Sequence, residues 1–422
     1  MTKKREIWLI VICWISYTVA QLGRYSYNSN FTLLKEHFSI NDAAVALPST
    51  LFFFAYGVGQ IFVGIFCHKF NRKLLVVSAL IISGALNLVI FFGADFFTIK
   101  YIWLLNGFVQ ANLWPVLLLI LRENVSPKRI VTAGVVVSTA STGGKFAAIG
   151  VCAIFAIDTS IFMYCFFAAG VLLLTVAILF LFATGKIKGA GDNEFTVAGQ
   201  EPAVPVENPK TKADAKSIIL LLLLCEFGLA CCAITGGLAC CAITGGLQSW
   251  VPAILKESYG LSDALSIFMS ILLPLFTLSV VVISPYLYKK LKNYVFISLL
   301  AFVVGAILIT GVLLLLDVSW IPVIILFTIE AVVMGIVSHT TTVQVPLTFK
   351  GKFDAGFLAG FLNGSCYIGT AAATYALGYI ADASGWTGAF ILLIAIAAFS
   401  ALLAVIYLIF DKKGKNKRIS IT

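Results

Sequence analysis

Long apolar runs alternate with short polar stretches along the whole chain. A helix needs about 17 to 25 mostly apolar residues to cross the hydrocarbon core of a bilayer. Lipid offers the backbone no hydrogen-bonding partners, so each run of this length predicts a transmembrane helix. Twelve runs qualify, over residues 7–29, 43–67, 74–93, 101–121, 130–157, 161–184, 217–254, 264–287, 294–316, 321–349, 355–380 and 386–410. We therefore expect an all-α membrane protein with twelve transmembrane helices.

Composition supports the same class. Hydrophobic residues make up 60% of the 422 residues and charged residues 11%, which leaves too little polar surface for a soluble protein of this size. The exception is residues 185–216, which are rich in Gly, Ala, Pro, Glu, Asp and Lys and cannot form a packed core. This stretch predicts a cytoplasmic linker between two pseudo-symmetric six-helix bundles, residues 1–184 and residues 217–422 with a cytoplasmic tail. In transporters built from such repeats, the binding site lies near the membrane midplane between them.

Lysine and arginine are concentrated in alternate loops. The loops on one side of the predicted membrane contain only Lys35, Lys100 and Lys256. The other side holds the N-terminus, the linker, the tail and the loops that contain Arg72, Lys73, Arg122, Lys128, Arg129, Lys289, Lys290, Lys292, Lys350 and Lys352. Because short basic loops stay in the cytoplasm, both termini are expected there, in a multi-pass protein of the plasma (inner) membrane. This distribution explains the net charge of +10 without a nucleic-acid partner.

Two cations interrupt apolar runs. Arg24 lies within the first run, where an unpaired charge costs about 3 kcal/mol or more unless it faces the protein interior or a water-filled cavity. Lys145 follows Gly143-Gly144, about 22 Å along the fifth run by helical rise. Both are candidate ligands for an anionic solute. The alternatives are snorkelling of Arg24 to the outer interface and a structural ion pair for Lys145.

Three further titratable residues lie in apolar runs of the second half. Glu226 and Glu330 could bind a proton or balance the charge of the two cations. His339 is a candidate for proton or substrate binding because its pKa is close to neutral. Glu330 and His339 are nine residues apart, so they should lie on different faces of a straight helix. The alternative for both carboxylates is a structural pair or a helix end that faces water.

A perfect tandem repeat occupies the seventh run. Residues 229–237 and 238–246 both read Leu-Ala-Cys-Cys-Ala-Ile-Thr-Gly-Gly. Nine extra residues lengthen a helix by about 13.5 Å and rotate the part beyond them by about 180°. A break at Gly236-Gly237 or Gly245-Gly246 would accommodate them; the duplication could also be inactivating, or an error in the sequence. The adjacent cysteines have no nearby histidines and predict packing rather than a metal site.

The chain resembles the major facilitator superfamily. Gly64, Arg72 and Lys73 fit the gating loop after its second helix, but His68 or Cys67 stands where the family has an acidic residue. Within the superfamily the chain is most similar to the organophosphate/inorganic-phosphate antiporters, such as the glycerol-3-phosphate and hexose-6-phosphate transporters. This similarity is found in residues 22–25, 55–57, 106–110, 114–115 and 355–360, and in Gly364, Tyr367, Gly369, Gly378, Asp382, Gly385 and Trp386.

The resemblance implies a major facilitator fold and a set of site residues. Arg24 would be the anion ligand of the first half, and Tyr17, Tyr56 and Tyr367 would line the cavity. Tyr17 and Arg24 are two helical turns apart and share a face. The family's other cationic or imidazole positions fall on Gln60, near Ser141, and around Thr235 or Thr244, so its second arginine is missing.

Together these features predict a secondary transporter that moves a small organic anion by alternating access. The resemblance suggests an organophosphate as substrate and inorganic phosphate as coupling ion. Loss of the second arginine leaves open proton-coupled uptake of a carboxylate or another monoanion, and a receptor that binds sugar phosphate without transport remains a further alternative. No nucleotide-binding loop, zinc motif or nucleophile triad is present, so we expect neither an enzyme nor a cofactor or metal. We expect a monomer in the lipid bilayer.

Overall fold

The computed structural model describes residues 3–66, 70–185, 239–291, 293–344 and 355–419. Every element within these ranges is a helix. The first part of the chain forms α1 (Lys3–Ser29), α2 (Phe31–Phe38), α3 (Asp42–Phe66), α4 (Arg72–Phe91), α5 (Phe96–Gln110), α6 (Leu113–Asn124), α7 (Pro127–Phe155) and α8 (Tyr164–Ala183). The second part forms η2 (Ala242–Gly246), α11 (Leu247–Tyr259), α12 (Asp263–Met269), α13 (Leu272–Thr277), α14 (Val280–Leu291), α15 (Tyr294–Leu315), α16 (Trp320–His339), η3 (Thr340–Gln344) and α18 (Ala355–Ile419).

These helices match the twelve predicted spans. Ten segments of the described chain are long and apolar enough to cross a membrane. The last of them contains two spans, because α18 bends sharply at Gly385, whose φ of 71° lies in the left-handed region that favours glycine. The segment of η2 and α11 corresponds to the seventh predicted span. The all-α membrane fold is therefore confirmed.

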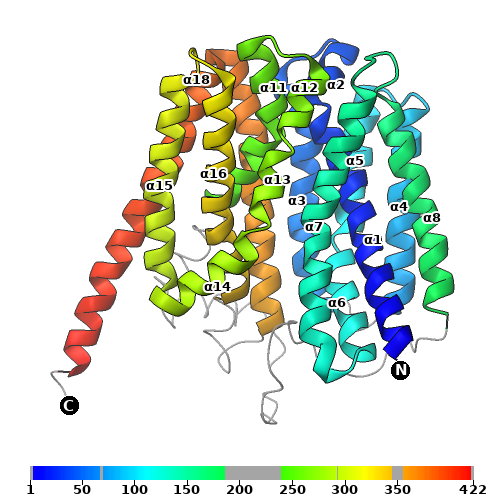
Figure 1. The fold of residues 1–422 in the computed structure, drawn as a ribbon, viewed down its shortest axis with the longest axis horizontal. Helices are drawn as coiled ribbons and strands as arrows, with labels where there is room; N and C mark the ends of the chain where they lie inside the picture. Colours follow the sequence, from blue (N-terminus) through cyan, green and yellow to red (C-terminus); the bar gives the residue numbers. More distant parts are fainter. Residues whose placement is uncertain (1–2, 67–69, 186–238, 292, 345–354, 420–422) are drawn as a thin grey trace.

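Two groups of helices lie side by side (Figure 1). In the first group α1 packs on α7 and α8, and α4 packs on α8; in the second group α15 packs on α16 and α18. Both chain ends lie at one end of the bundle, here called the terminal end, whereas α2, α11 and α12 lie at the other, here called the α2 end (Figure 1). Residues 186–216 of the predicted linker lie outside the described ranges, so the domain boundaries stay a prediction.

The most extensive contact between the groups joins α3 to α18. A Cβ atom on Gly57 would lie 2.8 Å from the carbonyl oxygen of Gly364, and one on Gly364 would lie equally close to the carbonyl oxygen of Gly57. The two backbones can approach this closely only because neither residue has a side chain. The predicted packing role of the glycine stripe is therefore confirmed at Gly364.

The second copy of the tandem repeat forms the π-helix η2, which continues directly into α11. It packs against α18: Thr370 donates a hydrogen bond to the carbonyl of Cys241 at 3.1 Å, and a Cβ on Gly246 would lie 2.7 Å from that of Ala373. The chain at Gly245-Gly246 thus widens from α to π geometry without a break. Gly236-Gly237 and the rest of the first copy lie outside the described residues.

An internal repeat with an offset of 221 residues shows which copy is in register. Leu34-Lys35-Glu36 and Asp42-Ala43 recur as Leu255-Lys256-Glu257 and Asp263-Ala264. The conformations also recur: α2 ends at a left-handed Ser39 and α11 at a left-handed Gly260. Upstream, however, Lys4 precedes Lys35 by 31 residues, whereas Lys216 precedes Lys256 by 40. The difference equals one copy of the repeat.

We expect the protein to fold without one copy. Deleting residues 229–237 leaves the same sequence as deleting 238–246, retains one copy to pack on α18, and restores the spacing of the first half. The melting temperature of the purified chain should change by less than about 4 °C, equivalent to about 1 kcal/mol. A control deletion of residues 229–233 leaves the upstream helix about 140° out of register and should be clearly less stable. Equal stability of the two deletions would contradict this assignment.

Candidate functional site

Arg24 lies in α1 and is only 1% exposed. Its Nε and Nη2 atoms both donate to Gln110 Oε1, each at 3.3 Å. Its guanidinium carbon lies 4.1 Å from the centre of the Tyr56 ring, 5.0 Å from that of Phe52 and 5.9 Å from that of Tyr367. Arginine stacks on aromatic rings in this way through its planar, delocalised charge. The side chain is therefore buried in the protein and does not snorkel to an interface.

Gln110 is held in place by a buried network. Its Nε2 atom donates to Ser83 Oγ at 2.7 Å and to Asn106 Oδ1 at 3.1 Å, and Ser83 Oγ donates to Asn106 Oδ1 at 2.7 Å. With both amide protons used in this way, the Gln110 carbonyl is turned towards Arg24. Ser83 comes from α4 and the other two from α5, so two helices of the first group orient the guanidinium. Sequence reasoning noted Asn106 and Gln110 only as part of a motif and assigned them no role.

The three predicted tyrosines gather around Arg24. Tyr56 of α3 and Tyr367 of α18 have ring centres 4.4 Å apart, which brings together the two helix groups. Tyr17 packs on Trp114 at 5.1 Å and interacts electrostatically with Arg24, Tyr56 and Tyr367. The structure thus brings Tyr17, Arg24, Tyr56 and Tyr367 into one cluster at the junction of the groups.

No carboxylate neutralises Arg24 within the described residues. The ion pairs found there all involve other cations, and Arg24 Nη1 is buried without a hydrogen-bond partner. Thr18 Oγ1 and both polar side-chain atoms of Gln21, on the same helix, are also buried and unpaired. Buried charges and polar groups normally have partners because their desolvation is costly. The α1 face around Arg24 therefore has the chemistry of an anion site.

Lys145 lines a pocket formed by both groups. Its Nζ atom lies 4.9 Å from the centre of the Tyr25 ring. The pocket is lined from the first group by Tyr25, Asn28, Ser29, Lys145 and Ile149, and from the second by Gln248, Ser249, Pro252, Ser270 and Pro274. Arg24 does not line this pocket, although it precedes Tyr25 on α1. Lys145 thus offers a second cation near the junction, separate from the tyrosine cluster.

Glu330 and His339 lie deeper in the second group. Glu330 is 1% exposed, and neither of its carboxylate oxygens has a hydrogen-bond partner in the described chain. The structure does not pair it with Arg24 or Lys145. His339 Nδ1 lies 3.0 Å from Ser284 Oγ of α14. Since α16 runs without interruption from Trp320 to His339, the two residues lie on different faces, as their spacing predicts.

Comparison with known proteins identifies the family. A model of the Major Facilitator Superfamily matches residues 13–374. The chain belongs to the Major Facilitator Superfamily. Two solved structures share its fold: a bacterial homolog of the human lysosomal transporter Spinster, in an inward-facing and occupied conformation, has a TM-score of 0.75 at 14% identity over 98% of both chains. The nucleoside transporter NupG has a TM-score of 0.68 at 13% identity, over 97% of this chain and 99% of its own.

Two curated relatives are similar over a shorter stretch. The membrane sensor protein UhpC of Escherichia coli (strain K12) is 26% identical over 119 residues, which cover 26% of this chain and 27% of UhpC. The UhpC protein of Salmonella typhimurium (strain LT2) is 24% identical over 102 residues, covering 24% and 23% of the two chains. The similarity thus spans about a quarter of either relative. At this length it supports the superfamily rather than an activity.

The remaining predicted residues of this facilitator have different surroundings. Arg72 begins α4, is buried, and forms an ion pair with Glu123 near the end of α6, while Gly64 lies in the last turn of α3. Lys73 donates its backbone N–H to Asn71, which caps α4. Their gating role stays a prediction, since Cys67 and His68 lie outside the described residues. Glu226 also lies outside them.

The positions where the family has further cations are occupied by neutral contacts here. Gln60 Nε2 donates to the carbonyl of Ala111 at 2.6 Å, and Gln60 Oε1 accepts from Asn363 at 3.3 Å. Thr244 donates to the carbonyl of Cys240 within its own helix at 2.8 Å. The 221-residue offset places Gly245 opposite Arg24, so the second half provides no arginine at the equivalent position.

Proposed function

We propose that this facilitator transports a small organic anion and that Arg24 is its main ligand. The observation that supports this most directly is the buried guanidinium of Arg24, which has no carboxylate partner in the described chain and one unused nitrogen. A buried arginine in a membrane protein normally faces a partner charge, a cavity or a ligand. An anionic substrate would supply the missing charge and accept the free N–H groups.

The substrate class follows from the same geometry. Phosphate and carboxylate groups match the planar donor pattern of a guanidinium. The polar and apolar residues of the Lys145 pocket suit a small polar body, with Asn28, Gln248 and Ser249 as hydrogen-bonding groups. Together with the sequence resemblance, this favours an organophosphate such as glycerol 3-phosphate or a hexose 6-phosphate. Exchange with inorganic phosphate follows from the resemblance, and the distribution of basic loops favours cytoplasmic termini.

The test is uptake into proteoliposomes. The purified full chain would be reconstituted with or without internal inorganic phosphate and supplied with labelled glycerol 3-phosphate or hexose 6-phosphate. Uptake that requires internal phosphate supports the antiport. Binding without uptake, detected as ligand-dependent thermal stabilisation, would instead support a sensor function like that named for UhpC. Absence of both binding and uptake for all anions tested would refute the proposed function.

Glu330 favours a second candidate, proton-coupled uptake of a monoanion. A carboxylate that is buried and unpaired is expected to hold a proton in this conformation, because its charged form has neither water nor a cation to stabilise it. Release of that proton in another conformation could drive uptake. Such a cycle needs one cationic ligand for a monoanion, which matches the absence of a second arginine.

Glu330→Gln separates the two candidates. If Glu330 carries the coupling proton, this substitution should abolish accumulation driven by a pH gradient while leaving exchange of labelled for unlabelled substrate at equilibrium. Glutamine resembles the neutral carboxylic acid in shape, so the melting temperature should stay the same within about 2 °C, or rise. Accumulation that keeps its full dependence on the pH gradient in Glu330→Gln would exclude Glu330 from coupling.

A further inference from the structure

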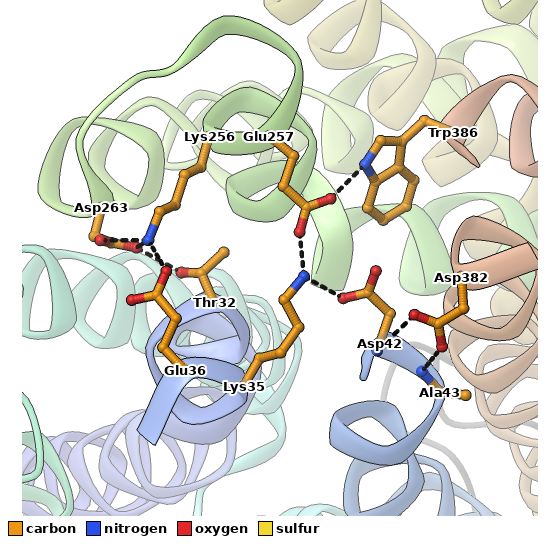
Figure 2. A network of polar contacts seen from close by, with 10 residues as sticks. All are labelled: Thr32, Lys35, Glu36, Asp42, Ala43, Lys256, Glu257, Asp263, Asp382 and Trp386. Carbon is orange, nitrogen blue, oxygen red and sulfur yellow. Dashed lines mark hydrogen bonds and ion pairs between the residues drawn. The ribbon is translucent and has the colours of Figure 1, made fainter. Parts of the chain in front are cut away.

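The two helix groups exchange charged side chains at the α2 end (Figure 2). Lys35 of α2 forms an ion pair with Glu257 of α11, and Lys256 of α11 forms one with Glu36 of α2 at 2.5 Å. Each lysine is also held within its own group, Lys35 by Asp42 at 2.8 Å and Lys256 by Asp263 at 2.8 Å. Each lysine therefore joins a carboxylate of its own group to one of the other group.

The exchange follows the internal repeat. Lys35 and Glu36 correspond to Lys256 and Glu257 at the offset of 221 residues, and each lysine pairs with the counterpart of the other's neighbour. This reciprocal pattern is the mark of a two-fold symmetric contact. Asn28 and Ser249 are also counterparts, and they hydrogen-bond to each other at 2.8 Å. A pseudo-two-fold axis therefore passes close to this pair, directly beside the pocket that contains Lys145.

Two further contacts cross between the groups at this end (Figure 2). Thr32 Oγ1 donates to Asp263 Oδ1 at 2.8 Å. Asp382 of α18 accepts from the backbone N–H groups of Asp42 at 3.0 Å and of Ala43 at 2.8 Å, so it caps the first turn of α3 from the other group. A carboxylate at a helix N-terminus is stabilised both by these hydrogen bonds and by the helix dipole.

At the terminal end the described ion pairs stay within the first group. Arg129 pairs with Glu6 at 2.7 Å, and Arg72 pairs with Glu123. Among the described residues, ion pairs between the groups are therefore confined to the α2 end. The charge distribution of the sequence predicts that this end faces away from the cytoplasm.

The lysines keep their charge in this network. Burial lowers the pKa of Lys35, but its hydrogen bonds to Asp42 and Glu257 have the opposite and larger effect, so the pKa is raised above its usual value. The pKa of Lys256 is raised in the same way by Asp263 and Glu36. Both lysines therefore remain protonated at neutral pH, and the contacts do not depend on which substrate occupies the pocket.

We propose that Lys35–Glu257 and Lys256–Glu36 form a two-fold symmetric latch that keeps the α2 end closed, and that both pairs must separate for the pocket to open at that end. The latch consists of these four residues. Asp42 and Asp263 position its lysines, and Asp382 adds a third link between the groups. Because the latch is partly exposed, salt screens it.

Hydrogen–deuterium exchange of the reconstituted full chain tests the latch. In Glu36→Gln/Glu257→Gln, exchange should rise several-fold in residues 31–46 of the first group and 247–265 of the second, and stay unchanged in α6 at the terminal end. Raising the salt concentration from about 0.05 M to about 1 M should produce the same rise in the wild type and little further rise in the variant.

Asp158→Asn is the matched control. Asp158 lies in the loop after α7, at the α2 end, and bonds to Ser160 beside it rather than to the second group. Its substitution should leave exchange in both segments unchanged. An unchanged exchange in the double variant, or a rise confined to one group, would overturn the latch. So would a rise spread evenly over all helices, because that would show general loss of stability.

Discussion

Arg24→Ala should reduce substrate affinity and uptake by about 100-fold or more. The substitution removes at least two charge-assisted hydrogen bonds to the anion, each contributing about 1.5 to 3 kcal/mol. Arg24→Lys keeps the charge but loses the planar donor pattern and the stacking on Tyr56, so it should recover only a small part of the activity. Uptake into proteoliposomes and ligand-dependent thermal stabilisation measure both variants.

The ligand-free protein distinguishes a binding role from a structural one. Since Arg24 has no carboxylate partner in the described chain, removing its buried charge should leave the melting temperature of the ligand-free protein unchanged or higher. Lys100→Ala is the control, because Lys100 contacts the rings of Phe96 and Phe97 on its own helix. Full uptake by Arg24→Ala would show that another group binds the anion.

Gly107→Ala should destabilise the fold by about 3 kcal/mol. Gly107 lies in α5 against the backbone of α3, where a Cβ atom would stand 2.9 Å from both the carbonyl carbon and the Cα atom of Phe52. Neither backbone can move without shifting its helix, so the cost should reach the upper part of the usual range for overpacking. Phe52 and Tyr56 also stack on Arg24, and uptake should fall together with the melting temperature.

Gly150→Ala is the matched control for this experiment. Gly150 also lies within a helix, α7, but a Cβ atom there has no neighbour within 4 Å. Alanine favours a helix over glycine by about 1 kcal/mol, so this variant should be as stable as the wild type or slightly more stable. If both glycine variants melt at the same temperature as the wild type, the close approach of α3 and α5 is wrong.

Local sequence was sufficient for the helices, because a bilayer selects spans by length and apolarity. The predicted run 294–316 and α15 (Tyr294–Leu315) differ by one residue at one end. Two details were missed. The fourth span divides between Gln110 and Leu113, and the eighth divides into α12, α13 and α14. Such interruptions depend on packing between helices, which apolarity alone does not encode.

The candidate site was predicted in part. A charge inside an apolar run identified Arg24, and the resemblance supplied the tyrosines that the structure gathers around it. Gln110, Ser83 and Asn106 escaped assignment because uncharged polar residues in a membrane helix are common at packing contacts. Helical rise placed Lys145 well inside the fifth span, but its separate pocket with residues of α11 and α13 was not foreseen.

The sequence by itself determined the class, the helices and the buried cation, because each depends on whether residues are apolar or charged within one span. Only the tertiary structure decided which charges meet. Lys35 and Glu257 are 222 residues apart, and their pairing requires two helix groups to face each other across a pseudo-two-fold axis. The repeated Lys-Glu pair was visible in the sequence, but its meaning depends on the relative placement of the groups, which is set by the packing of α3 against α18.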